Sequence, residues 1–327
     1  MSTLWPCLVL PFDVSGTGYA VDPATLVPMF QGIAEADAQA HWLFGNDNPT
    51  LADMLAGTMM TPRLGTLLQT GGSGYTTVPA LARIGSGQTI PQTLSCALTG
   101  GAVSSFTETD PGSEDATAAG SVTVTGGGGA GAAFAATKAP DPTQQSGFLS
   151  LANAPASTVN GWQTPIEIKR DQTVCLVMKR KALAATTMCL GYWPPGSSRQ
   201  PCWQVQIVAA GYTAYSRGGA GNFAGDGQII APPAGSVGDW LFLAVTHDAA
   251  GARRIDWGGG ASYNQAGALD VSDLRHRIGI GGSVVSYSGG LDAAELIAFP
   301  AAKTAGQIAA IYARSKERLL ARGITLL

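Results

Sequence analysis

The chain has 327 residues, of which 45% are hydrophobic and only 13% are charged, about half of the roughly 25% usual for soluble domains. Its formal net charge is −3, so it has no basic surplus for neutralising phosphates, which argues against sequence-independent nucleic-acid binding. The hydrophobic fraction is sufficient for a packed core, and no apolar run reaches the roughly 20 residues of a membrane-spanning helix. We therefore expect a soluble protein that is made in a cytoplasm and does not insert into a membrane.

The cysteines and histidines do not form a metal-binding pattern. The chain carries five cysteines: Cys7, Cys96, Cys175, Cys189 and Cys202. No C-x-x-C pair occurs, and only three histidines could supplement the cysteines: His41, His247 and His276. We therefore expect no metal and no cofactor. Cys175 and Cys189 lie in apolar runs, which predicts small buried side chains rather than nucleophiles.

Residues 1–40 form an N-terminal arm with no apparent core of its own. An apolar stretch broken by prolines covers residues 4–11, and Asp22-Pro23 is typical of a helix start. Two interpretations stay open: the arm docks on the main domain as a strand, or it grips a neighbouring subunit. After it, His41–Gly45 reads as a short buried strand, followed by a capped turn that ends at Asp53.

The segment 70–143 is rich in Gly, Ala, Ser and Thr and is weakly self-similar, since Gly72-Ser73 recurs as Gly112-Ser113. Each copy runs from a turn through a short strand, at residues 80–84 and 121–125, towards a glycine cluster. A flexible linker is the alternative for this composition, but the recurrence favours a small ordered β module. No Gly-Lys-Ser/Thr follows the glycines, so a phosphate-binding loop is not expected.

Short strand-like runs separated by turn signals fill the rest of the chain as far as residue 299. They include Thr173–Met178, Met188–Trp193, Trp203–Val208, Trp240–Thr246, Arg254–Trp257, Arg277–Ile280 and Leu296–Phe299. Such spacing predicts a β-sandwich or jelly roll, with a hairpin at residues 248–251. A helix follows, with a capping box at Thr304 and Gln307 and an end at Gly323. We expect its basic side chains to form a solvated face: Arg314, Lys316, Arg318 and Arg322.

Three motifs late in the chain resemble the laminin-G-like, concanavalin A-type lectin/glucanase fold. They are W-L-F-L-A-V-T-H-D from Trp240, I-G-I-G-G from Ile278 and A-E-L-I-A-F from Ala294. This resemblance covers residues 41–69 and 144–327. It implies an all-β concanavalin A-like jelly-roll sandwich, with residues 70–143 inserted as a Gly-rich β-repeat module and a C-terminal helix.

The Gly-rich segment itself resembles repeats common in bacteriophage tail and baseplate proteins, through G-S-G-Y-T at residues 72–76 and G-G-G-G-A-G-A-A-F-A-A-T at residues 126–137. The second copy lacks the Gly-Tyr-Thr signature of the first. This resemblance implies a virion structural protein that is assembled in the host cytoplasm and bound to other virion proteins. It also implies a homo-oligomer, with a trimer favoured by analogy to tail fibres.

Catalysis is not expected. Glycosidases on this type of fold use two carboxylates that face one cleft. Asp292 and Glu295 are three residues apart, and an odd spacing places side chains on opposite faces of a regular strand. Asp270 and Asp273 read as caps in a polar loop, and no nucleophile elbow accompanies His247 or His276.

Binding of a surface glycan is the function that the side chains favour. Sugar sites combine aromatic faces with Asn, Asp and backbone amides. Candidate contacts lie in or beside the turns of the sandwich: Tyr192, Trp193, Tyr212, Tyr215, Asn222, Trp257, Tyr263 and Asn264. The alternative for each aromatic residue is a place in the core or in an oligomer contact.

Three functions follow from these patterns. The leading one is a phage tail fibre or baseplate-peripheral component that attaches to host-surface glycans, with avidity in place of single-site affinity. The second is a capsid decoration or cement protein that stabilises the head. The third is a glycan-active hydrolase, which the carboxylate spacing disfavours.

Overall fold

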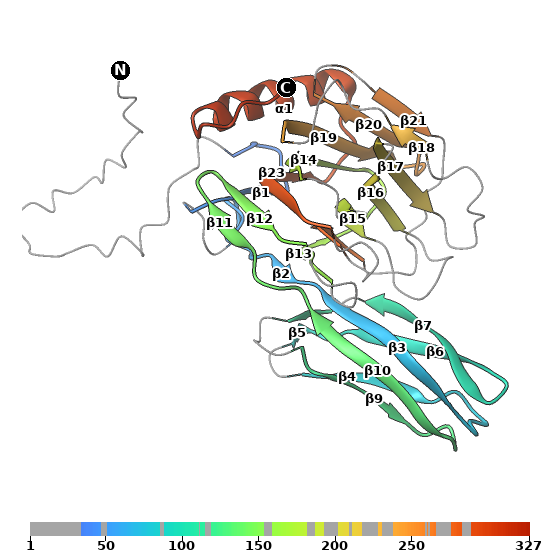
Figure 1. The fold of residues 1–327 in the computed structure, drawn as a ribbon. Coiled ribbons are helices and arrows are strands. Elements are labelled where there is room, and N and C mark those ends of the chain that lie inside the picture. Colours follow the sequence, from blue (N-terminus) through green and yellow to red (C-terminus); the bar gives the residue numbers. More distant parts are fainter. Residues whose placement is uncertain are drawn as a thin grey trace, which may run out of the picture.

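The computed structural model describes residues 34–46, 51–85, 88–110, 112–114, 119–153, 159–181, 187–192, 202–208, 211–217, 228–230, 238–258, 260, 262–265, 276–282 and 289–327. Within these residues, two large antiparallel sheets form the main body (Figure 1). The first sheet has eight strands, in the order β11 (Thr143–Gln145), β12 (Phe148–Leu151), β23 (Leu291–Phe299), β14 (Gln172–Arg180), β19 (Trp240–His247), β20 (Arg253–Trp257) and β21 (Ser262–Gln265), with β1 (Ala40–Leu43) also paired to β23.

The second sheet has seven strands. Their order is β18 (Gln228–Ile230), β17 (Gly211–Arg217), β16 (Cys202–Val208), β15 (Thr187–Tyr192), β22 (Arg277–Ile280), β13 (Trp162–Glu167) and β2 (Thr61–Pro62). Each strand-like run that the sequence analysis predicted between residues 173 and 299 overlaps one of the strands in these two sheets. The predicted hairpin between β19 and β20 is also confirmed, since Asp248 N–H donates to the Ala252 carbonyl over 3.0 Å.

The sandwich has two apolar layers. The layer between the sheets contains Leu176 and Leu243 from the first sheet and Val205 and Ile280 from the second. A second layer lies on the outer face of the first sheet, under the helix α1 (Ala305–Leu320). The predicted all-β fold with one C-terminal helix is therefore confirmed.

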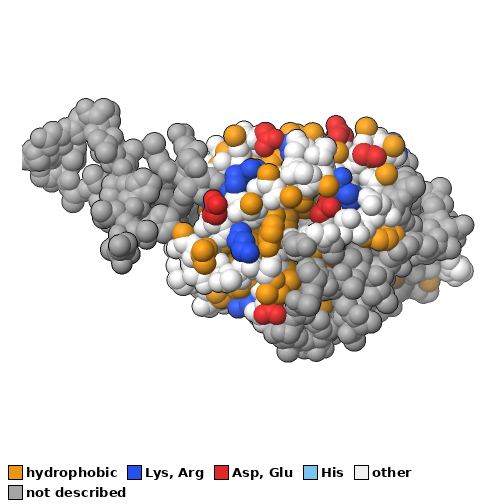
Figure 2. Space-filling model, turned by 90° about the horizontal axis from the view of Figure 1, so that it is seen from above, with side chains coloured by type: hydrophobic (Ala, Val, Ile, Leu, Met, Phe, Trp, Pro, Cys, Tyr) orange, Lys and Arg blue, Asp and Glu red, His pale blue; other side chains and the backbone are white. Residues whose placement is uncertain are grey.

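The helix begins where the capping box predicts. The Thr304 hydroxyl accepts from the Gln307 N–H over 3.3 Å, and the Gln307 side chain accepts from the Thr304 N–H over 2.8 Å. The helix packs on the sheet through three buried side chains: Ile308, Ile311 and Leu319. It is the one α-helix in the described part of the chain, and no helix there is long and apolar enough to cross a membrane. From above, basic and acidic side chains lie interspersed rather than sorted by sign (Figure 2).

The Gly-rich segment is an ordered β module that projects from one end of the sandwich (Figure 1). Its strands pair as β3 (Leu64–Ser73) with β10 (Ala130–Lys138), β4 (Ala80–Ile84) with β9 (Ser121–Thr125), β5 (Gln88–Ile90) with β8 (Ser113–Glu114), and β6 (Thr93–Thr99) with β7 (Ala102–Asp110). The two strands predicted from the recurrence, β4 and β9, are thus partners of each other. The module has its own small core, in which Phe106 and Phe134 pack edge to face with ring centroids 5.7 Å apart.

Glycine is required where the turns of this module meet. Gly127 has a φ of 76°, and a Cβ there would lie 2.7 Å from the Thr77 carbonyl oxygen. Strand pairing places the change from sandwich to module at Arg63 and Ala139, whose backbones are joined by a hydrogen bond of 2.9 Å. These positions lie a few residues from the predicted boundaries at 69/70 and 143/144.

Of the N-terminal arm, the structure describes residues from 34 onwards. Gln39 N–H donates to the Ala298 carbonyl over 2.7 Å, which extends β1 along β23. The predicted helix start at Asp22-Pro23 and the apolar stretch 4–11 lie outside the described residues. The choice between a docked strand and a subunit-gripping arm therefore stays a prediction.

Candidate functional site

The carboxylates of β23 lie on one face of the sheet, so the predicted placement of Asp292 and Glu295 on opposite faces is wrong. In the pairing with β14, Val177 lies opposite Glu295 and Met178 lies opposite Ala293, so Ala294 is an extra residue. This β-bulge reverses the alternation. Ala293 therefore belongs to the layer between the sheets, whereas Ala294 belongs to the layer under α1.

Both carboxylates are nevertheless held in separate structural ion pairs. Asp292 lies 3.1 Å from Lys179 Nζ and 3.0 Å from Lys181 Nζ. Glu295 Oε1 lies 2.8 Å from His41 Nε2 and 2.8 Å from Arg318 Nε. His41 accepts the Glu35 backbone N–H at Nδ1, so its Nε2 carries the hydrogen that is donated to Glu295.

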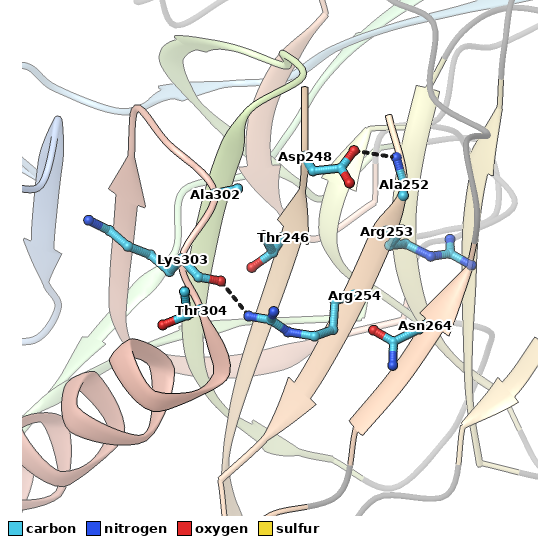
Figure 3. A pocket seen from close by; sticks show the side chains of 9 residues that line it. All are labelled: Thr246, Asp248, Ala252, Arg253, Arg254, Asn264, Ala302, Lys303 and Thr304. Carbon is cyan, nitrogen blue, oxygen red and sulfur yellow. Dashed lines mark hydrogen bonds between the residues drawn. The ribbon is translucent and has the colours of Figure 1, made fainter. Parts of the chain in front are cut away.

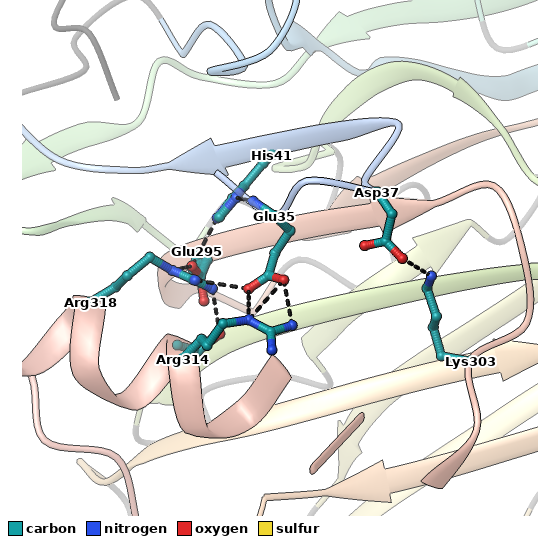
Figure 4. A network of polar contacts seen from close by, with 8 residues as sticks. Glu35, Asp37, His41, Glu295, Lys303, Arg314 and Arg318 are labelled. Atoms are coloured by element: carbon teal, nitrogen blue, oxygen red, sulfur yellow. Dashed lines mark hydrogen bonds and ion pairs between the residues drawn. The ribbon is translucent and has the colours of Figure 1, made fainter. Parts of the chain in front are cut away.

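These contacts belong to a network that ties the chain's early segment to the helix (Figure 4). Glu35 lies 2.6 Å from Arg314 Nη2 and 2.8 Å from Arg318 Nη1. Burial raises the pKa of Glu295, but the hydrogen bond from His41 and the charge of Arg318 outweigh it and bring the pKa to about 2. The two carboxylates of the network, Glu35 and Glu295, are therefore ionised at neutral pH.

The expected solvated basic face of α1 is wrong for Arg318, whose side chain is 10% exposed, and for Arg322, whereas the Arg314 side chain is 49% exposed although it also binds Glu35. Arg314 and Arg318 bind Glu35, and Arg322 donates to the Phe44 carbonyl over 2.5 Å. Lys316 lies over the Tyr312 ring at 5.9 Å. The sequence contained no sign of this arrangement, because the acidic partner lies nearly the whole chain length away.

A second polar cluster joins the β module to the sandwich. Arg277 binds Asp110 through two nitrogens at 2.7 and 3.3 Å, and His276 Nε2 lies 3.3 Å from the Glu108 carbonyl oxygen. The buried Glu108 carboxyl also contacts the Tyr192 hydroxyl, and burial raises its pKa to about 8. Arg63 donates to the Gly281 carbonyl over 2.8 Å. The junction is therefore built from specific polar contacts.

An open pocket of about 470 Å³ lies where the hairpin β19–β20, strand β21 and the entry to α1 meet (Figure 3). Its lining residues are Thr246, Asp248, Ala252, Arg253, Arg254, Asn264, Ala302, Lys303 and Thr304. The Arg254 guanidinium lies in the centre of this view and is fixed at two points. Its Nε donates to Asp256 over 2.7 Å, and its Nη2 donates to the Lys303 carbonyl. Of the predicted contacts whose side chains the structure describes, only Asn264 lines this pocket.

The other predicted glycan contacts are distributed differently. Tyr192 is 1% exposed and Trp257 is 2% exposed, so neither side chain is a surface contact in this structure. Tyr263 is half-buried, with the Arg253 guanidinium 6.0 Å from its ring centroid. Two predicted contacts lie on β17, where only the backbone is described: Tyr212 and Tyr215. Trp193 and Asn222 lie outside the described residues.

The sequence analysis missed Arg254 and Thr304 as pocket residues and took Asp248 only as part of a turn. One signal for Arg254 was present: Asp256 follows two residues later, which places both side chains on the same face of one strand. Among the residues that the structure describes, no group of three or more His, Cys, Asp and Glu side chains is placed to hold a metal ion.

Comparison with known proteins adds little to this picture. No family model and no curated protein matches the chain. Among solved structures, the chain is similar to the botulinum neurotoxin serotype D binding domain, with a TM-score of 0.40 and 12% identity over 52% of this chain and 43% of that one. The type G receptor binding domain gives a TM-score of 0.37 and 11% identity over 52% and 42% of the two chains.

A third similar structure is the serotype D ligand binding domain in complex with N-acetylneuraminic acid, with a TM-score of 0.39 and 14% identity over 52% and 42% of the two chains. The chain thus spans less than half the length of the toxin domains it resembles. At these TM-scores the likeness is too distant to support an inference about function.

Proposed function

We propose that this chain is a structural binding protein of a bacteriophage virion, a tail fibre or baseplate-peripheral component that attaches the particle to a glycan on the host surface. The observation that carries this proposal is the junction between the β module and the sandwich. Arg277 with Asp110, and Glu108 with its contacts, fix one β body on another at a defined orientation. Such a composite body suits a protein that presents surfaces at fixed positions on a particle.

We further propose that the chain is not an enzyme. A retaining or inverting glycosidase needs one carboxyl group that gives a proton and one that stays ionised, both facing the substrate. Asp292 is neutralised by two lysines, and Glu295 is held by His41 and Arg318. Neither is available for that role. Turnover of a bacterial polysaccharide, lost on Glu295→Gln or Asp292→Asn while folding is retained, would contradict this.

Attachment would depend on multivalent binding by several copies of the chain rather than on high affinity at one site. A homo-oligomer, which we propose to be a trimer bound to other virion proteins, multiplies weak contacts by effective concentration. The low charged fraction of the chain, 13%, is consistent with this role, because few charged side chains have to be desolvated when subunits meet.

Quantitative mass spectrometry of purified particles, with the chain located by electron microscopy, tests the proposal. A low copy number at the tail is the expected result. A high copy number spread over the head would instead favour the capsid decoration or cement role, for which the same rigid body is suited. Absence of the chain from particles would refute both.

A further inference from the structure

The pocket beside α1 presents three polar groups that have no partner among the described residues. Asp248 Oδ1 accepts the Ala250 and Ala252 N–H groups at 2.9 and 2.8 Å, so Oδ2 is the oxygen that remains available. Arg254 Nη1 and the Asn264 side chain likewise have no partner in the described part of the chain. All three groups border one cavity (Figure 3).

Two of these groups are held in place before any ligand arrives. Arg254 is fixed by Asp256 and by the Lys303 carbonyl, and its side chain is 24% exposed. The Asp248 carboxylate is fixed by the two N–H groups of its own turn. Preorganised groups lose little conformational freedom on binding, which favours a ligand that bridges them.

The charges around the pocket favour a neutral ligand over an anionic one. The Arg254 guanidinium is already paired with Asp256, which leaves the Asp248 carboxylate uncompensated. The other two cations of the lining do not offset it. Lys303 Nζ binds Asp37 and lies 4.7 Å from the Phe299 ring centroid, while the buried Arg253 stacks over Tyr263. In Figure 3 both of these side chains point away from the cavity.

We propose that this pocket binds a neutral saccharide, with Asp248 accepting hydrogen bonds from vicinal hydroxyls and Arg254 and Asn264 contacting the adjacent oxygens. The inference rests on the proposed attachment function and names the ligand class of that function. The volume of about 470 Å³ lies within the range of about 300–1,000 Å³ for small-molecule pockets. Ala252 and Ala302 supply the apolar contact for the ring carbons.

The lining residues that the structure describes include no aromatic ring on which a sugar could stack. A single site should therefore be weak, and useful binding needs several copies of the chain, as the attachment function requires.

The full-length chain is tested on an array of immobilised neutral oligosaccharides with glucose, galactose, mannose or rhamnose ends, beside sialylated and uronic-acid oligosaccharides. We expect binding to at least one neutral glycan, and loss of that binding when one vicinal hydroxyl is O-methylated. Binding to acidic glycans alone would overturn the assignment.

Three variants locate the site. Asp248→Asn retains the oxygen that caps the turn but replaces the free acceptor with a donor, and we expect it to weaken binding by about tenfold or more. Asn264→Ala should weaken binding in the same direction. The matched control is Asp141→Asn, the same chemical change at an exposed residue outside the lining, and it should leave binding unchanged.

The outcomes separate this inference from the proposed function. Unchanged neutral-glycan binding by folded Asp248→Asn and Asn264→Ala would overturn the pocket and leave glycan attachment standing. Absence of binding to every glycan, for a chain located on the tail, would overturn the pocket and leave the virion role standing. Thermal unfolding of each variant verifies that it is folded.

Discussion

Ionisation of Glu108 should make the protein less stable as the pH rises towards 8. The side chain is 0% exposed at the junction of β7 with the sandwich, and burial raises its pKa from 4.5 to about 8. The charged groups that act on it are Arg83 and Arg63, which favour the carboxylate, and Asp110, which opposes it. We choose Glu108→Gln as the perturbation because glutamine has nearly the shape of the protonated acid but does not titrate.

The expected magnitude follows from the difference in pKa between the folded and unfolded states. Below pH 4.5 the carboxyl is protonated in both states, so it adds no pH dependence. Between 4.5 and 8 the folded protein retains a proton that the unfolded chain has lost. The free energy of unfolding then falls by about 1.4 kcal/mol per pH unit, reaching a total of roughly 5 kcal/mol. Above pH 8 both states are ionised, and the difference is constant.

Urea denaturation at intervals from pH 5 to pH 8 measures this difference. Other groups contribute to both proteins alike: burial lowers the pKa of His247 to about 3, so its contribution to stability rises with pH between 3 and 6.5 in each. The difference between wild type and Glu108→Gln isolates the one carboxyl. Two parallel curves over this range would refute the assignment of a protonated Glu108 at the junction.

Three further substitutions test other parts of the fold. In the wild type, the ionised Glu295 contributes to the free energy of unfolding above pH 4.5, and this contribution is lost as the pH falls towards 2. Glu295→Gln should remove that contribution, which is measured by the free energy of unfolding at a series of acidic pH values. Leu296→Ala should lower the free energy of unfolding by about 2–5 kcal/mol, since the side chain is fully buried between the sheets. Gly129→Ala should destabilise the module by about 1–3 kcal/mol, because its Cβ would lie 2.5 Å from Tyr75 N. Faster hydrogen exchange of the Tyr75 amide, with β14 amides unchanged, would report that effect.

Local signals in the sequence were sufficient for the helix and for part of the strands, whereas others, such as β13 and β17, were not predicted. The β-branched and apolar run at 173–178 became β14, and the Thr304–Gln307 capping box marked the start of α1 to the residue. Each of these signals lies within one turn or one strand, so no long-range partner is needed to interpret it. The recurrence in the Gly-rich segment likewise indicated β4 and β9, although not that they pair with each other.

The candidate site was harder to predict, because it depends on which face of a strand each side chain occupies and on contacts between residues that are far apart in the sequence. Trp257 lies two residues after Ile255, so both side chains face the layer between the sheets, and this parity could have removed Trp257 from the candidate contacts. The bulge at Ala294 had no such signal, since it depends on the register between β23 and β14. The pocket likewise joins a hairpin, a strand and a helix start that are separated in the sequence.

The charged residues of the β module indicate what the junction does. Glu108 and Asp110 are two residues apart on β7, so they share a face, and both contact the sandwich. A wholly apolar contact would hold two bodies together equally well, whereas buried polar pairs tolerate only the geometry in which every partner is satisfied. Because a slip or rotation would separate Glu108 from Tyr192 and Arg277 from Asp110, the polar junction fixes the direction in which the module points. A fixed direction is what the proposed attachment role would require, because the pocket and the module would then face different neighbours.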